Sequence, residues 1–276
     1  MARPLDTRRG GGPFAFAVPQ LLARGTPGRE ALCTGGRITY DRARGWARSR
    51  EDGDWEVGKT MRVVTIDGPA GAGKSTVARR LADRLGWRLL DTGAMYRAVT
   101  LAALRAGVDL ESDRELGDLA ARVTVQLPPG RVLLDGEDIS AIVRGVEITR
   151  ASRHLADSPS VRRCLVTWQR DFAAETDVVA EGRDQGTVVF PDAFRKFFLT
   201  ASPEERARRR HAEFSARGET VALDVVLRDI RERDDRDENR AIAPMRPADD
   251  ARVIDSTGLD PDRVVALLED DILARS

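Results

Sequence analysis

The chain has 276 residues, and 41 % of them are hydrophobic, which is enough apolar material for a sizeable core. Its 45 basic residues balance 45 acidic ones, so the net charge gives no reason to expect a nucleic-acid or membrane-surface partner. Cys33 and Cys164 match no zinc spacing, and so few cysteines are typical of the reducing cytoplasm. We therefore expect a cytoplasmic globular protein with reduced thiols, and separately we expect it to be a monomer.

Residues 1–60 are rich in Gly and Arg and lack the apolar period of a helix or strand, so we expect this segment to be disordered. An arginine pair before the apolar stretch 14–22 faintly imitates a twin-arginine export signal, but Pro19 interrupts that stretch. Met61 stands directly before the first clear strand pattern. The segment is either translated upstream sequence or an authentic extension, and both alternatives place the domain boundary at about residue 61.

Residues 62–86 have the order strand, glycine-rich loop and helix. β-branched residues predict a short strand at 62–66, and Gly68-Pro-Ala-Gly-Ala-Gly73-Lys74-Ser75 then fits G-x-x-x-x-G-K-[ST] at every fixed position. Apolar residues at helical spacing follow the loop, and Gly86 stands where a left-handed C-cap is expected. This context predicts a nucleoside triphosphate site, because glycines let backbone N–H groups approach phosphates and the helix N-terminus adds a positive dipole end.

The side chains of the loop have distinct expected tasks. Lys74 should reach the β and γ phosphates, and Ser75 can place its hydroxyl on a Mg²⁺ ion that bridges them. The candidate nucleotide-binding residues are Gly68, Gly71, Gly73, Lys74, Ser75 and Thr76. The chain contains neither an N-K-x-D guanine-reading motif nor an L-S-G-G-Q-type signature. A small-molecule kinase is therefore favoured over a regulatory GTPase and over a motor or transporter ATPase.

Strand and helix patterns alternate along the rest of the chain. Strands are predicted at 87–90, 178–180 and 252–254, and a hairpin is predicted at 123–127 and 131–134 around a Pro-Pro-Gly turn. Asp91 and Thr92 can cap the helix that follows them, and Asp260-Pro261 forms a good start for a closing helix. This alternation predicts an α/β fold with a parallel sheet, whose ligands bind at the carboxyl ends of its strands.

Three further stretches give the chain a specific resemblance. They are D-T-G-A-M-Y-R at 91–97, E-G-R-D-Q-G-T-V-V-F-P-D at 181–192 and R-E-R-D-D-R-D-E-N-R at 231–240. In this order and spacing they resemble the signatures of bacterial cytidylate kinases, within the nucleoside monophosphate kinase group of P-loop proteins. The resemblance covers the chain from about Met61 to its end. It implies a three-layer P-loop kinase core, an acceptor domain inserted at roughly 94–165 with a small β insertion, and a mobile lid.

The same resemblance implies the reaction and the roles of residues. MgATP would donate its γ-phosphoryl group to CMP, and to dCMP. The catalytic residues would be Lys74, Arg183, Arg233 and Arg240. The substrate-binding residues would be Thr92, Arg97, Ser152, Arg162, Arg183, Asp184, Asp237 and Arg240. Among these, Arg97 and Arg183 would hold the acceptor phosphate, Asp184 the ribose, and Ser152, Arg162 and Asp237 the cytosine, although the interval from Ser152 to Arg162 is one residue longer than the family's usual pattern.

Less specific interpretations of these residues stay open at this point. In residues 229–240 acidic and basic residues alternate, and charged residues stand at i,i+4 at Asp229 and Arg233, Glu232 and Arg236, and Arg236 and Arg240, which also fits a solvated, salt-bridged helix face. That interpretation is favoured for Arg236. Arg97 could be a helix-surface arginine, and Asp184 could make an Asx turn. For the whole chain, a kinase acting on UMP, AMP or shikimate, or a nucleotide-binding switch without transfer activity, are the rivals.

Overall fold

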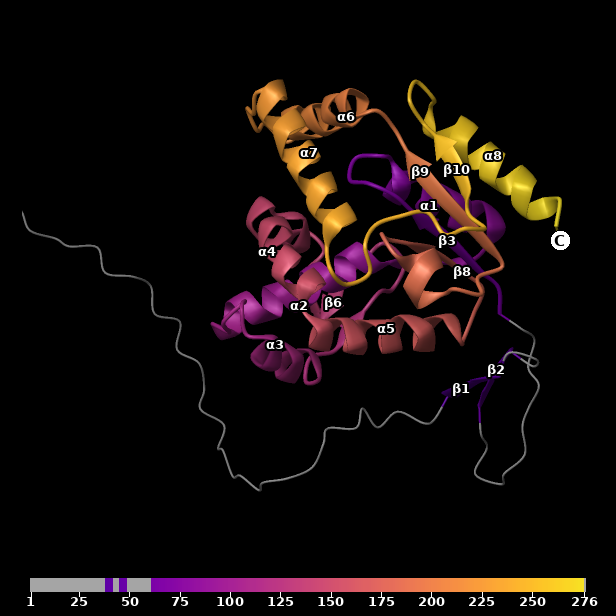
Figure 1. The fold of residues 1–276 in the computed structure, drawn as a ribbon. Coiled ribbons are helices and arrows are strands. Elements are labelled where there is room, and N and C mark those ends of the chain that lie inside the picture. Colours follow the sequence, from indigo (N-terminus) through magenta and orange to yellow (C-terminus); the bar gives the residue numbers. More distant parts are fainter. Residues whose placement is uncertain (1–37, 42–44, 49–60, 276) are drawn as a thin grey trace, which may run out of the picture. The chain divides into compact units, whose positions relative to one another are not determined.

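The structure is a computed structural model, and it describes residues 38–41, 45–48 and 61–275 (Figure 1). Contacts divide the chain into residues 1–33, none of which is described, and residues 34–276. Strands β1 (Ile38–Asp41) and β2 (Gly45–Arg48) form an antiparallel hairpin in which Tyr40 pairs with Trp46. This hairpin departs from the expected disorder of residues 1–60, and Ile, Thr, Tyr and Trp are the residue types that favour strands. The remainder of that segment lies outside the described residues.

A central sheet of five parallel strands organises the described chain, in the order β10-β9-β3-β8-β4. Its strands are β3 (Val63–Asp67), β4 (Arg88–Asp91), β8 (Val178–Glu181), β9 (Arg195–Thr200) and β10 (Arg252–Asp255). All except β9 were predicted to within about a residue. Because β3 is the middle strand, its carboxyl end places the glycine-rich loop at the centre of the sheet edge where α/β proteins bind ligands.

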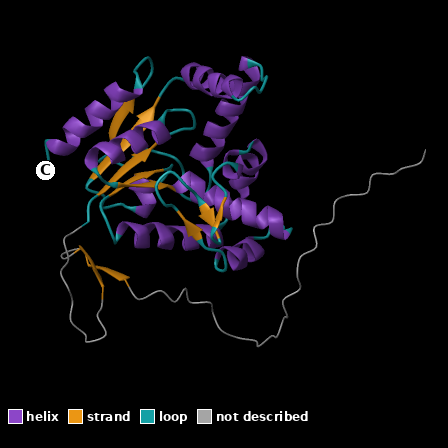
Figure 2. Cartoon of the chain, turned by 180° about the vertical axis from the view of Figure 1, so that it is seen from behind, coloured by secondary structure: helices purple, strands orange, loops and turns teal. Residues whose placement is uncertain are grey.

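Helices cover both faces of the sheet (Figure 2). Successive strand residues point to opposite faces, so Val64 and Ile66 pack into one apolar cluster and Val63 into the other. α1 (Lys74–Leu85) and α8 (Pro261–Leu273) supply the first cluster, and α2 (Thr92–Ala106) and α5 (Pro159–Ala173) supply the second. These three layers confirm the predicted α/β kinase core.

The segment between β4 and β8 holds most of the second apolar cluster. Besides α2 and α5 it contains α3 (Asp113–Ala120), the 3-10 turn η1 (Ile142–Arg144) and α4 (Val146–Asp157). The predicted hairpin is present but shorter, as β5 (Val125–Gln126) and β6 (Leu133–Leu134), and a third strand, β7 (Glu137–Asp138), joins it. The third strand follows from a tight turn at Asp135 and Gly136, both of which have positive φ.

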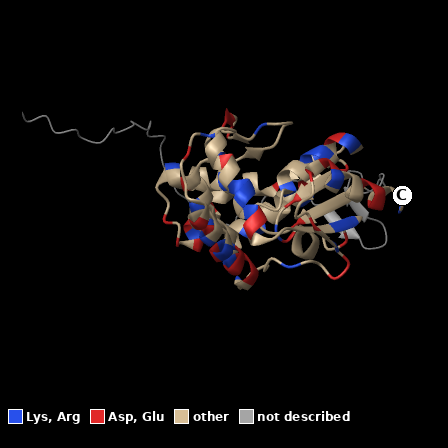
Figure 3. Ribbon diagram, turned by 90° about the horizontal axis from the view of Figure 1, so that it is seen from above, with Lys and Arg blue, Asp and Glu red and all other residues tan. Residues whose placement is uncertain are grey.

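Two helices and two connections complete the described chain. α6 (Pro203–Ala216) follows β9 and packs on α7 (Leu223–Asn239) through a small cluster of Ala207, Val226 and Ile230. A π-helical turn, η2 (Gln185–Val189), follows β8. Acidic and basic residues are interspersed along the helices (Figure 3). Among the described residues, no helix is both long enough and apolar enough to cross a membrane.

Candidate active site

The loop between β3 and α1 has a backbone that requires glycine. Gly68, Gly71 and Gly73 have φ values of 137°, 78° and 90°, which other residues rarely adopt. A Cβ atom on Gly68 would lie 2.0 Å from the carbonyl oxygen of Leu199, so that position also has no room for a side chain. The loop therefore returns sharply and lets α1 begin at Lys74, as the motif predicts.

Lys74 and Ser75 open α1 at this loop. The Lys74 side chain is buried, with a relative exposure of 6 %, and its Nζ donates to the carbonyl oxygen of Pro69 at 2.7 Å. Ser75 is exposed, and its hydroxyl donates to Oε2 of Glu181 at 2.9 Å. Thr76, the next residue, is also exposed. The Ser75 hydroxyl of α1 and the Glu181 carboxylate of β8 thus meet beside the ammonium group of Lys74.

The last residues of the neighbouring strands β3 and β8 are both acidic and lie next to the loop. Glu181 ends β8, and burial together with the charge of Asp91 raises its pKa to about 7. Asp67 ends β3 and accepts hydrogen bonds from the backbone N–H groups of Gln185 at 2.9 Å and Gly186 at 2.8 Å, while burial raises its pKa to about 6. The Asp67 side chain therefore holds the turn after β8 against the start of the phosphate loop.

The motif at the start of α2 contacts the same strand end. Asp91 caps α2 by accepting from the N–H of Ala94 at 2.7 Å, as predicted. Thr92 does not cap the helix; its hydroxyl donates to the carbonyl oxygen of Glu181 at 2.7 Å. Arg97 lies one turn further on, with Nη2 3.9 Å from Asp91 Oδ1, and its Nε is buried without a hydrogen-bond partner among the described residues. This unsatisfied donor is suited to an anionic ligand.

A second group of side chains surrounds Asp184. Oδ2 of Asp184 accepts a hydrogen bond from Nη2 of Arg162, and Oδ1 lies 3.8 Å from Nη2 of Arg240. The Arg240 Nη2 atom is buried and has no hydrogen-bond partner in the described part of the chain, while its Nε donates to Ala243 O at 2.6 Å. Burial raises the pKa of the neighbouring Tyr96 to about 12, and Asp184 opposes its ionisation further. Asp184 makes no capping bond to the turn after it, so the Asx-turn interpretation is wrong.

Two arginines, one just after β8 and one on α7, complete the site around Lys74. Nε of Arg183 donates to Oδ2 of Asp237 at 3.0 Å, and Nε of Arg233 lies 3.8 Å from the same oxygen. Burial, and next the charge of Arg183, lower the pKa of Lys74 well below its usual value and that of Arg233 to about 10. Lys74, Arg183 and Arg233 thus stand close enough together to disfavour one another's charge, and a polyanion such as a triphosphate would stabilise this arrangement.

Comparisons with known proteins agree with this geometry. The family model described as cytidylate kinase matches residues 64–272. A cytidylate kinase of Vibrio cholerae is 53 % identical over 207 residues, which are 74 % of this chain and 92 % of that protein. Cytidylate kinases of Aliivibrio salmonicida and Aeromonas salmonicida are 50 % and 49 % identical over 208 residues, which are 74 % of this chain and 93 % and 90 % of those proteins. The chain belongs to the cytidylate kinase family.

The structure brings together most of the residues that the family signatures suggested, but not all. Ser152 lies on α4 and donates to Thr149 O of its own helix at 2.8 Å, and no contact among the described residues joins it to the other candidates. The helix-face pairs expected in residues 229–240 are also absent from the described contacts. Arg233 faces Asp237 instead, and Arg240 lies beyond the end of α7. Arg236 is exposed, in agreement with its expected place on the solvated face.

Some residues of the site were missed at the level of the sequence. Glu181 and Tyr96 both lie inside the cytidylate kinase signatures, so their presence in those stretches was the available signal. Asp67 has a weaker signal, as the last residue of the strand before the loop. Arg206, on α6, contacts the phosphate loop through the carbonyl oxygen of Ala70 at 3.2 Å, and it lies outside every quoted motif. Nothing in the local sequence distinguished it from the other arginines of that helix.

Proposed function

We propose that this protein transfers the γ-phosphoryl group of MgATP to CMP, and to dCMP, giving the nucleoside diphosphate and ADP. The observation that carries the proposal is the convergence of Lys74, Arg183 and Arg233, from three different elements, on the phosphate loop of a chain in the cytidylate kinase family. Transfer between two nucleotides brings several negative charges together, and these cations are placed to offset them.

The reaction needs no side-chain nucleophile. An oxygen of the acceptor phosphate attacks the γ-phosphorus in line, and the bond to the β-phosphate oxygen breaks. Lys74, Arg183 and Arg233 stabilise the charge that spreads over the transferring group, because their charges already stand close together before the substrates bind. Arg97 would hold the acceptor phosphate together with Arg183, and Arg240 would close over the phosphates. Arg97 and Arg240 each have a buried, unsatisfied guanidinium nitrogen for such a bond.

The residues beside the loop fit a magnesium ion that arrives with the nucleotide. Magnesium prefers oxygen ligands and usually keeps waters and substrate phosphates in its shell. The Ser75 hydroxyl and the Glu181 carboxylate supply oxygens here, and the described residues contain no group of three His, Cys, Asp or Glu side chains that could hold an ion alone. Ser75 would therefore hold Mg²⁺ together with the phosphates, and the bound ion would neutralise charge on the β and γ oxygens.

The acceptor nucleoside is assigned to the group around Asp184. Asp184 would accept a hydrogen bond from the ribose, and Arg162 and Asp237 would read the base, with residues 94–165 as the acceptor domain. Arg162 and Arg240 already contact Asp184. Asp237 contacts both Arg183, which follows β8, and Arg233 of α7. The Ser152 hydroxyl donates within its own helix, so its oxygen would act as the acceptor in the proposed contact with cytosine.

The helices α6 and α7 would form the lid. Closure of α7 over the phosphates would exclude water and suppress hydrolysis of ATP. We propose that the enzyme is a monomer of the cytoplasm, where its nucleotide substrates occur.

The proposal is tested by measuring ADP production from MgATP with CMP, dCMP, UMP, AMP or no acceptor, side by side. We expect ADP production that depends strictly on CMP or dCMP. Equal, slow production in all five reactions would show that the phosphate loop is real and the acceptor assignment is wrong. Production that depends on UMP or AMP alone would keep the kinase and replace its acceptor.

A further inference from the structure

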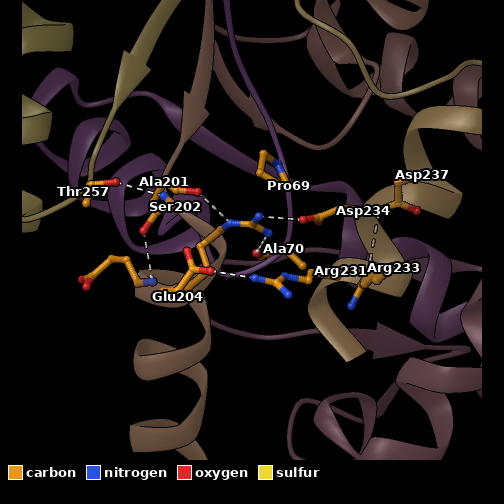
Figure 4. Close-up of polar contacts among 12 residues, drawn as sticks. Pro69, Ala70, Ala201, Ser202, Glu204, Arg231, Arg233, Asp234, Asp237 and Thr257 are labelled. Atoms are coloured by element: carbon orange, nitrogen blue, oxygen red, sulfur yellow. Dashed lines mark hydrogen bonds and ion pairs between the residues drawn. The ribbon is translucent and has the colours of Figure 1, made fainter. Parts of the chain in front are cut away.

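Arg206 is a buried arginine that contacts three segments at once. Its side chain is 5 % exposed and lies on α6. Nε donates to Ala201 O at 2.9 Å, at the end of β9, and Nη1 donates to Ala70 O at 3.2 Å, in the phosphate loop. Nη2 lies 2.6 Å from Oδ2 of Asp234, on α7 (Figure 4). One guanidinium group thus joins the sheet, the phosphate loop and the second lid helix.

The phosphate loop packs directly on this residue. A Cβ atom on Gly71 would lie 3.1 Å from Cβ of Arg206 and 3.3 Å from its carbonyl oxygen. A side chain at position 71 would therefore crowd Arg206, and a movement of Arg206 away from the loop would break the bond to Ala70. The arginine is held in place on the loop side, so it provides a fixed partner for α7.

Asp234 depends on that partner. Its side chain is 13 % exposed, and its Oδ1 is buried without a hydrogen-bond partner among the described residues. A buried carboxylate is costly unless a paired cation offsets its desolvation, and Arg206 is the cation placed to do so. If α7 moved so that Asp234 and Arg206 separated, each of these two buried charges would lose its partner.

The position of Asp234 on α7 links this pair to the chemistry. Asp234 directly follows Arg233, and Asp237 lies three residues further on, so Asp234 and Asp237 are neighbours on one helix face. Asp237 accepts from Arg183 at 3.0 Å. Holding Asp234 against the phosphate loop therefore also sets where Arg233 and Asp237 stand relative to Lys74.

We propose that Arg206 and Asp234 are positioning residues for phosphoryl transfer, which fix the lid helix α7 in register with the phosphate loop. The inference rests on the proposed kinase function. Neither side chain is assigned to a substrate, so the pair acts through Arg233 and Asp237. A displacement of about 1 Å at a reacting centre can cost on the order of 100-fold in rate, so even a small slip of α7 is expected to be visible in kcat.

The two helices offer a matched control. Arg231 Nη2 lies 2.7 Å from Oε1 of Glu204, so this second ion pair also joins α7 to α6 (Figure 4). Its side chains are 60 % and 54 % exposed. Glu204 makes no described contact with the phosphate loop. If joining the helices were sufficient, the loss of either pair would have the same effect.

The experiment compares the full-length variants Asp234→Asn and Glu204→Gln with the wild type. For Asp234→Asn we expect kcat to fall by about 10- to 100-fold with a much smaller change in KM for CMP, because the loss is confined to the transition state. Backbone hydrogen exchange, measured by mass spectrometry without substrates, should become faster in residues 223–239 and stay unchanged in residues 74–85. Glu204→Gln should match the wild type in both measurements. Asp234→Glu, which keeps the charge, should recover part of the lost kcat.

Several results would overturn the inference. One is an Asp234→Asn enzyme with kcat near wild type, and another is an equal loss in Glu204→Gln. A third is a fall in activity that disappears when it is normalised to the folded fraction from urea titrations, since that would make the pair a contributor to folding alone. Failure of the kinase proposal itself would look different, because the wild type would then lack CMP-dependent ADP production while the exchange difference in residues 223–239 could still be measured.

Discussion

Arg183 is the residue at which the parts of the site meet. It follows the end of β8, donates to Asp237 on α7, and its charge lowers the pKa of both Lys74 and Arg233. One guanidinium group therefore interacts both with Lys74 of the phosphate loop and with Asp237 of the proposed lid helix. Since Arg183 is only partly buried, with 20 % of its side chain exposed, it remains accessible to a ligand.

The first prediction concerns Arg183. Replacing it in Arg183→Ala removes a preorganised donor from the transferring phosphoryl group, so we expect kcat to fall by about 100- to 1,000-fold. The matched control is Arg236→Ala, which removes an exposed arginine of α7 and should leave kcat near the wild-type value. The measurement is the CMP-dependent rate of ADP production. An Arg183→Ala enzyme as active as the control would show that the site has been assigned to the wrong arginine.

The second prediction concerns the buried carboxylate of Asp67, whose pKa rises from 3.8 to about 6. Because ionisation is disfavoured in the folded state, the contribution of Asp67 to stability falls as pH rises from about 4 to about 6. The shift corresponds to roughly 3 kcal/mol. The Asp67→Asn variant lacks this pH dependence of stability. A penalty from its changed hydrogen bonds would be the same at every pH, so it would not alter the slope of the free energy of unfolding against pH.

Urea titrations at several pH values test this. The free energy of unfolding of the wild type minus that of Asp67→Asn should decrease between pH 4 and pH 6 and then level off. A difference that is constant with pH, or that rises, would mean that the backbone hydrogen bonds from Gln185 and Gly186 outweigh the cost of burying the charge.

At the scale of elements, two glycines on either side of α1 differ in why glycine is needed, because only one of them is crowded by a neighbouring strand. Gly86 and Gly68 both have positive φ, at 67° and 137°. A Cβ atom at Gly86 would meet nothing within 4 Å, whereas one at Gly68 would meet the Leu199 carbonyl at 2.0 Å. Gly86 is therefore required only for its positive φ. Gly68 is required for its positive φ and also because β9 leaves no room for a side chain there.

The third prediction follows from this difference. Gly86→Ala should lower the free energy of unfolding by about 1 kcal/mol, the usual cost of the left-handed conformation. Gly68→Ala should lower it by more than about 4 kcal/mol, because a backbone carbonyl must also move. Chemical denaturation of the two variants provides the comparison. Equal losses would mean that the end of β9 yields easily and that the close approach has little energetic weight.

At the scale of the whole molecule, the site uses residues that are far apart in the chain. The phosphate loop at 68–75, the turn after β8 and the helix α7 meet because β3 is the central strand, with β8 beside it. The sheet begins at Val63, and the family match begins at residue 64. All the side chains assigned to the reaction lie beyond that point.

The fourth prediction is therefore that residues 61–276 suffice for the reaction. We expect this fragment to fold and to have the kcat and KM for CMP of the full chain, since no assigned residue precedes Asp67. The assay of ADP production, run with both forms at equal concentration, is the measurement. A fragment that folds but has an altered KM would assign residues 1–60 a part in substrate binding.

Much of this protein followed from its sequence. The loop motif, the strands beside it and the caps at Asp91, Gly86 and Asp260 were predictable because each depends on neighbours a few residues away. The three signatures also identified the family. Local patterns failed where the partner was distant: β9 was missed, and the charges of α7 were paired along the helix, whereas in the structure Asp234 pairs with Arg206 of another helix.

The tertiary structure alone decided which of many arginines and carboxylates act together. Spacing along the chain could not show that Thr92 binds the carbonyl of Glu181, that Asp184 lies between Arg162 and Arg240, or that Arg206 joins the phosphate loop to α7. The physical reason is that burial and charge pairing depend on what the parallel sheet brings to one edge. Sequence determines which groups can bind phosphate, and the order of strands determines which of them share a site.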